Sequence, residues 1–94
     1  MAEYDLVIRN ARVVTEDRQL DGDIAVKNGC VVALEPAISG KGAREIDAGG
    51  KFVLPGGVDS HCHIEQKSGM GVMCADDFYT GTVSAAFGGT TTII

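Results

Sequence analysis

A proline–glycine–glycine breaker at Pro55-Gly56-Gly57 divides the chain into two stretches of different character. Proline cannot donate to a sheet ladder, and neighbouring glycines weaken any helix or strand that contains them. Neither kind of element can therefore run through this point. We predict a small all-β unit over residues 1–54 and a second unit, of a different type, over residues 55–94.

The first stretch consists of short β-rich runs separated by turn residues. Asn28-Gly29 lies between two of these runs and predicts a type I′ hairpin, because both central residues of that turn need a positive φ. No helical period of useful length appears. The pattern indicates part of a β-sandwich, with strands expected over residues 5–9, 12–15, 23–27, 30–34, 45–47 and 51–54.

The second stretch predicts a strand over 58–64, a glycine-containing loop, a helix over 78–87 and a strand over 90–94. Asp76-Asp77 suit the start of the helix and Gly88-Gly89 its end. Tyr79, Val83 and Ala86 are apolar positions at spacings of four and three, which suit one face of a helix. Strand, helix and strand in this order predict a βαβ unit with parallel strands and a right-handed crossover.

Composition excludes several classes of protein. A net charge of −5 argues against a nucleic-acid binder, and no apolar run approaches the roughly 18 residues of a membrane span. The three cysteines have no framework spacing, which favours small buried thiols in a reducing cytoplasm. The sequence stops within the β-branched run 90–94. We therefore expect the N-terminal piece of a longer cytoplasmic protein, and no catalytic activity from this piece alone.

His61 and His63 are the only histidines of the chain. On a strand, alternate residues share a face, so the two imidazoles point the same way and lie roughly 6–7 Å apart along the strand, with Cys62 opposite. Two such nitrogens suit one divalent cation, zinc above all. Asp59 shares this face and is better placed to hydrogen bond a ligand than to be one. A chance His-x-His pair without a metal is the alternative.

The position of this pair favours a site. It follows a parallel strand and opens into a loop, where α/β barrels and doubly wound sheets build their active centres. Catalytic zinc needs at least three protein ligands and an open position. Since only two are present, we expect the remaining ligands outside residues 1–94.

The residues around the histidines resemble the N-terminal signature of the amidohydrolase superfamily, through Phe-Val-Leu-Pro-Gly-Gly-Val-Asp-Ser-His-Cys-His at 52–63. Residues 5–15, 75–82 and 85–91 are similar to the dihydropyrimidinase and hydantoinase branch of that superfamily. The resemblance implies a metal-dependent hydrolase of the α/β class, a (β/α)8 TIM barrel with an N-terminal β-sandwich domain. This chain would supply the sandwich strands (1–54) and the first βαβ unit of the barrel (55–94).

The same resemblance implies that His61 and His63 ligate the more buried of two metal ions, usually zinc, with manganese or cobalt as the alternatives. A bridging carboxylated lysine, two further histidines and an aspartate general base are expected beyond residue 94, so no catalytic residue falls within the chain. The implied reaction is hydrolysis of the ring amide of a dihydropyrimidine or hydantoin to an N-carbamoyl amino acid, as in pyrimidine catabolism. The implied partners are the small cyclic amide and further subunits of a homotetramer, with neither nucleic acid nor membrane.

The loop after the histidines departs from the branch, where a Pro-Phe pair is common. Met70 and Met73 here could line an apolar pocket or serve ordinary packing, and Glu65 could touch the site or remain solvated. A dihydroorotase or allantoinase is the alternative within the same chemistry. A non-enzymatic dihydropyrimidinase-like assembly protein and a plain β-rich binding module are the alternatives outside it.

Overall fold

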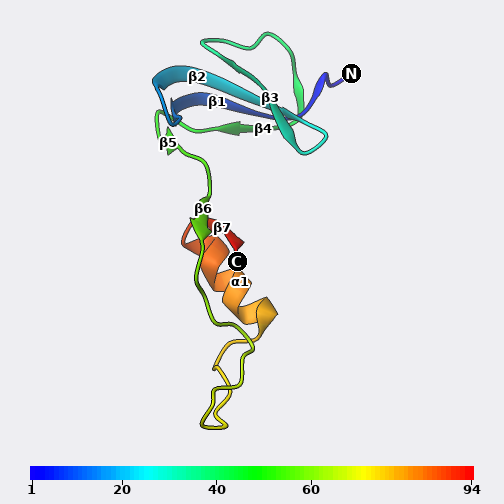
Figure 1. Ribbon diagram of the computed structural model, residues 1–94. Coiled ribbons are helices and arrows are strands. Elements are labelled where there is room, and N and C mark those ends of the chain that lie inside the picture. Colours follow the sequence, from blue (N-terminus) through cyan, green and yellow to red (C-terminus); the bar gives the residue numbers. More distant parts are fainter. The chain divides into compact units, whose positions relative to one another are not determined.

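The computed structural model describes residues 1–94, which divide into two compact units, Met1–Pro55 and Gly56–Ile94 (Figure 1). The first unit is a five-stranded mixed sheet with the order β3-β2-β1-β4, in which β5 also pairs with β1. Its strands are β1 (Tyr4–Val14), β2 (Gln19–Lys27), β3 (Cys30–Glu35), β4 (Gly42–Asp47) and β5 (Phe52–Val53). Only one sheet is present, so the unit supplies a single layer of the expected sandwich.

The central strand β1 is continuous, where the sequence predicted two separate strands around Asn10. The register with β2 shifts between Ile8 and Ala11, and Asn10 has a φ of 55°. Asparagine tolerates this left-handed conformation better than most residues, so it forms a bulge instead of ending the strand. The bulge changes which face later residues occupy, and it brings Ala11 and Val13 to the apolar cluster that Ile8 contacts.

The predicted hairpin is confirmed. β2 and β3 are antiparallel, with Lys27 opposite Cys30, and the turn residues Asn28 and Gly29 have φ values of 52° and 75°. Both sheet faces carry small apolar clusters. One is built on Val7, Ala25 and Ile38, and the other on Ala11, Val13 and Ile24. Ile38 comes from the segment between β3 and β4, which therefore covers part of one face.

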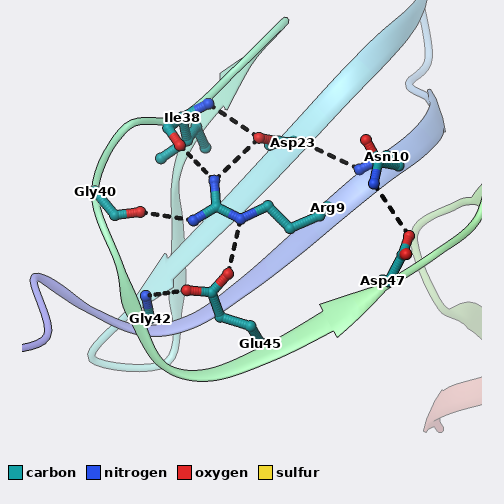
Figure 2. Close-up of polar contacts among 8 residues, drawn as sticks. All are labelled: Arg9, Asn10, Asp23, Ile38, Gly40, Gly42, Glu45 and Asp47. Atoms are coloured by element: carbon teal, nitrogen blue, oxygen red, sulfur yellow. Dashed lines mark hydrogen bonds and ion pairs between the residues drawn. The ribbon is translucent and has the colours of Figure 1, made fainter.

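Arg9 fastens this segment to the sheet (Figure 2). Its guanidinium donates to the backbone carbonyl of Ile38 and, at 2.8 Å, to that of Gly40. It also pairs with Asp23 at 3.2 Å and with Glu45 at 2.8 Å. Burial would raise the pKa of Asp23, but hydrogen bonds from the backbone N–H groups of Ile38 and Asn10, together with Arg9, lower it overall. The pKa of Glu45 is also lowered, chiefly by the hydrogen bond from Arg9.

The second unit is the predicted βαβ arrangement: β6 (Gly57–Asp59), α1 (Phe78–Phe87) and β7 (Thr90–Ile93), with β6 and β7 parallel. Asp77 caps α1 as expected. Its side chain accepts a hydrogen bond from the Thr80 N–H at 2.8 Å, which lowers the pKa of Asp77, while the Thr80 hydroxyl accepts one from the Asp77 N–H. Gly88 and Gly89 follow the last turn, and Gly89 takes a φ of 86°.

No residue of α1 is fully buried within residues 1–94. Tyr79 and Val83 are 77% and 38% exposed, whereas Gly81 and Ala85 are the half-buried positions of the helix. Small side chains allow this part of the helix to lie close to its neighbours within the unit. Ile64 is the neighbour at Gly81, since a methyl group added there would lie 3.1 Å from its Cδ1 atom.

The cysteines also differ from expectation, because none of them is fully buried. Cys30 is exposed, and Cys62 and Cys74 are half-buried. Cys30 opens β3 beside the hairpin turn, where the sheet offers no cover. The only helix, α1, has 10 residues, and no helix of the chain meets the length and apolarity that a membrane crossing requires.

Candidate metal centre

The strand that leads to the histidines is shorter than predicted. β6 ends at Asp59, where the sequence predicted a strand through Ile64. Its only partner is the four-residue strand β7, and the last backbone hydrogen bond between them runs from the Ile94 N–H to the Asp59 carbonyl at 2.9 Å. Without a further partner, residues after Asp59 have no ladder to join. The histidines therefore lie in the segment that follows the C-terminal end of β6.

The structure brings His61 and His63 together. Their Nε2 atoms are 3.1 Å apart, and their ring centroids are 5.1 Å apart with planes inclined at 59°. A flat strand would hold the residues roughly 6–7 Å apart along its axis. The chain bends at Ser60 and His61, and the two rings converge so that their Nε2 atoms lie closer than this spacing. Both side chains are exposed, so the pair is accessible from solvent.

The neighbouring polar residues contact the pair in different ways. Asp59 accepts a hydrogen bond from the backbone N–H of His61 at 3.0 Å, so it holds the backbone and not the imidazole ring. Cys62 points elsewhere, because its thiol lies 3.6 Å from the carbonyl oxygen of Ile94. Gln66 contacts the pair directly, through its Oε1 atom on Nδ1 of His63.

The segment after His63 is fastened to the start of α1. Ile64 lies against Gly81, the Glu65 N–H donates to the Asp76 carbonyl at 3.0 Å, and the Glu65 carboxylate accepts a hydrogen bond from the Phe78 N–H at 3.3 Å. Glu65 also has a φ of 54°, a conformation that most side chains avoid. Its carboxylate therefore binds the first turn of the helix and does not turn toward the histidines.

The next loop closes on itself and leaves its methionines exposed. Lys67 and Met73 form an isolated antiparallel bridge, and the Cys74 N–H donates to the Gln66 carbonyl at 2.9 Å. Met70 and Met73 are 90% and 54% exposed, so neither forms an enclosed apolar pocket within this chain. A cavity of about 290 Å³ is lined instead by His63, Gln66, Ser68 and Cys74.

The centre is incomplete within these residues. No group of three or more His, Cys, Asp or Glu side chains is placed so that it could hold a metal ion. The pair His61 and His63 can supply two nitrogen ligands to one cation, and any third ligand must come from elsewhere. The sequence did not predict the contact of Gln66 with His63, because a single glutamine belongs to no recognised metal-site motif. Its position three residues after His63 was the available signal.

Comparison with known proteins identifies relatives along almost the whole chain. No family model matches it. The D-hydantoinase of Ralstonia pickettii is 43% identical over 90 residues, which cover 96% of this chain and 19% of that protein. The dihydropyrimidinase of Rattus norvegicus is 46% identical over 94 residues, covering 95% of this chain and 18% of the relative.

A solved structure shows the same likeness. The crystal structure of D-hydantoinase from Bacillus sp. AR9 superposes with a TM-score of 0.86 at 45% sequence identity, covering 94% of this chain and 19% of that one. The chain thus spans about a fifth of the length of the proteins that it matches. Sequence and structure agree on one assignment: the chain belongs to the hydantoinase and dihydropyrimidinase family.

Proposed function

We propose that the chain is the N-terminal, metal-binding part of a cyclic amidohydrolase that converts dihydropyrimidines or hydantoins to N-carbamoyl amino acids. The observation that carries the proposal is the convergence of the His61 and His63 Nε2 atoms, 3.1 Å apart, just after the C-terminal end of β6. The family membership supports the reaction class. Under this proposal, the complete enzyme is the protein that contains this chain.

The two imidazoles fit a zinc ion. Two nitrogens that each lie about 2.1 Å from one tetrahedral zinc ion are roughly 3.4 Å apart. The observed 3.1 Å between the Nε2 atoms is only a few tenths of an ångström less. The separation of the two ring nitrogens is therefore compatible with two ligands of one ion. Imidazole nitrogen is also a ligand that zinc prefers.

The metal, when bound, supplies Lewis acidity toward the amide carbonyl and toward a water molecule. The residues of this chain perform the positioning. Asp59 fixes the His61 backbone at the end of β6, and the contacts of Ile64 and Glu65 with α1 fix the segment after His63. The remaining ligands and the general base belong to other parts of the enzyme, so the isolated chain should not hydrolyse substrate.

The architecture of the complete enzyme is part of the proposal. β6, α1 and β7 are then the first βαβ unit of a (β/α)8 barrel, and the sheet of β1 to β5 is one layer of its sandwich domain. Barrel enzymes carry their active sites at the C-terminal ends of the strands, which is where His61 and His63 follow β6. Two zinc ions per site, a homotetramer and a cytoplasmic location complete the proposal.

The test measures metal content and hydrolysis in the complete enzyme. His61→Ala and His63→Ala should each lower the zinc content and abolish hydrolysis of hydantoin and dihydrouracil. Ser60→Ala is the matched control, because Ser60 is an exposed neighbour and should leave both quantities unchanged. Unaltered zinc stoichiometry in the histidine variants would contradict the proposal.

The same preparation separates the alternatives. Turnover of dihydroorotate or allantoin, with none of hydantoin or dihydrouracil, would assign the enzyme to a different substrate class. A complete protein that binds no zinc and hydrolyses none of these compounds would favour a non-enzymatic assembly protein.

A further inference from the structure

Both ring nitrogens of His63 have a partner. Its Nε2 atom lies 3.1 Å from Nε2 of His61, and its Nδ1 atom contacts Oε1 of Gln66. His61 differs, since its only side-chain contact is through Nε2. The two members of the pair are therefore not equivalent, and the asymmetry comes from Gln66.

The contact with Gln66 determines where the proton of a neutral His63 lies. An amide oxygen can only accept a hydrogen bond, so the Nδ1 atom that faces it must carry the hydrogen. A neutral imidazole has one N–H, which leaves Nε2 with a free lone pair. That lone pair is the one directed toward His61, at the place where a shared cation would lie.

Gln66 is fixed independently of His63. Its backbone carbonyl accepts a hydrogen bond from Cys74 at 2.9 Å, and the next residue, Lys67, forms a bridge with Met73. The Ser68 N–H donates to the Val72 carbonyl at 2.8 Å, which closes the same loop. These contacts hold the backbone of Gln66 in a closed loop, so the position from which its amide reaches the His63 ring does not depend on His63.

We propose that Gln66 is a positioning residue for the metal centre: its Oε1 atom holds His63 in the tautomer and ring orientation that present Nε2 to the cation. The inference rests on the proposed function, and it assigns a role to a residue outside the His-x-His motif. Partners of this kind on the remote nitrogen of a ligating imidazole commonly change metal affinity by about 10- to 100-fold when removed.

The experiment compares two substitutions of Gln66 in the complete enzyme. Gln66→Met has a similar length but offers Nδ1 only a weakly accepting thioether, whereas Gln66→Glu keeps an oxygen at the same place. Zinc affinity is measured by competition with a chelator, and the thermal unfolding of the metal-free protein is measured in parallel. We expect Gln66→Met to weaken zinc binding by about 10- to 100-fold with an unchanged unfolding temperature, because the side chain is exposed. Gln66→Glu should bind zinc at least as tightly as the wild type.

Each outcome has one meaning. Zinc affinity in Gln66→Met equal to that of the wild type overturns the inference and leaves the proposed function intact. Zinc binding in Gln66→Glu that is weaker than in the wild type by about 10-fold or more overturns it too, and this comparison with the wild type decides the matter if the methionine variant fails to fold. Absence of zinc from the wild-type enzyme is a different result, since it refutes the proposed function itself.

Discussion

The carboxylate of Asp59 accepts a hydrogen bond from the backbone N–H of His61 at 3.0 Å, two residues further along the chain. The Asp59 carbonyl accepts, at 2.9 Å, the last backbone hydrogen bond that links β6 to the end of β7. One residue therefore ends the strand through its backbone and starts the turn through its side chain. This local turn is of the kind that aspartate and asparagine favour. It fixes the backbone position from which the His61 side chain extends.

Asp59→Ala should weaken zinc binding by the complete enzyme about 10- to 100-fold, the range found when a residue that orients a ligand is removed. The loss should be smaller than in His61→Ala, which removes a ligand. Asp59→Asn is the matched control, because its side-chain oxygen can still accept from the His61 N–H. Chelator competition gives both affinities. Equal zinc affinity in wild type and Asp59→Ala would show that this hydrogen bond does not position His61.

The contact between Ile64 and Gly81 makes a second prediction. A leucine at position 81 would displace Ile64, since even a Cβ atom there would lie 3.1 Å from its Cδ1 atom. Overpacking of this kind costs about 1–3 kcal/mol, and the displaced segment carries His63. Gly81→Leu should therefore lower both the free energy of unfolding in urea and the zinc affinity. Ser84→Leu, at an exposed position of the same helix, should change neither.

Local signals in the sequence predicted a large part of this fold. Asn28-Gly29 correctly predicted the hairpin, because few other residue pairs adopt the positive φ values that such a turn requires. Asp77 and Gly88-Gly89 likewise bounded α1 through the chemistry of helix ends. Each of these signals acts over a few residues, and the structure confirms each of them.

Properties that depend on distant partners were predicted less well. The length of β6 depends on β7, more than 30 residues away, so alternation of residues overestimated the strand. Gly81 of α1 is half-buried and lies against Ile64, a contact that helical spacing does not reveal. The contact of Gln66 with His63 depends on the path of the loop, which the sequence did not predict. The sequence predicted that the two histidines share a face, but it did not predict that their Nε2 atoms lie only 3.1 Å apart.

The network around Arg9 predicts acid sensitivity of the first unit. The lowered pKa values of Asp23 and Glu45 mean that the folded protein holds these carboxylates ionised more strongly than the unfolded chain does. Their stabilisation is complete above the pKa values of the unfolded chain, about 4, and is lost as the pH falls through the lower values of the folded state. Urea unfolding followed by circular dichroism should therefore show a free energy that decreases below about pH 4.

Variants test whether Asp23 is the source of this dependence. Asp23→Ala should cost about 1–3 kcal/mol at pH 7, because it leaves the backbone N–H groups of Asn10 and Ile38 without an acceptor. The acid limb of the stability curve should become shallower in this variant. Asp21→Ala is the matched control, since Asp21 pairs with Arg12 only at the exposed surface, at 3.5 Å, where such pairs contribute little. An acid limb that is unchanged in Asp23→Ala would assign the pH dependence to other carboxylates.

The hairpin turn makes a prediction about backbone conformation alone. Gly29 has a φ of 75°, and no atom lies within 4 Å of where its Cβ would be, so Gly29→Ala adds no clash with a neighbour. The left-handed conformation costs an L-residue roughly 1–2 kcal/mol, and we expect a loss of that size in urea unfolding. Gly29→Asn should lose less, because asparagine enters this conformation more readily. Equal losses for alanine and asparagine would contradict this prediction, because they would show that the loss does not come from the left-handed conformation of residue 29.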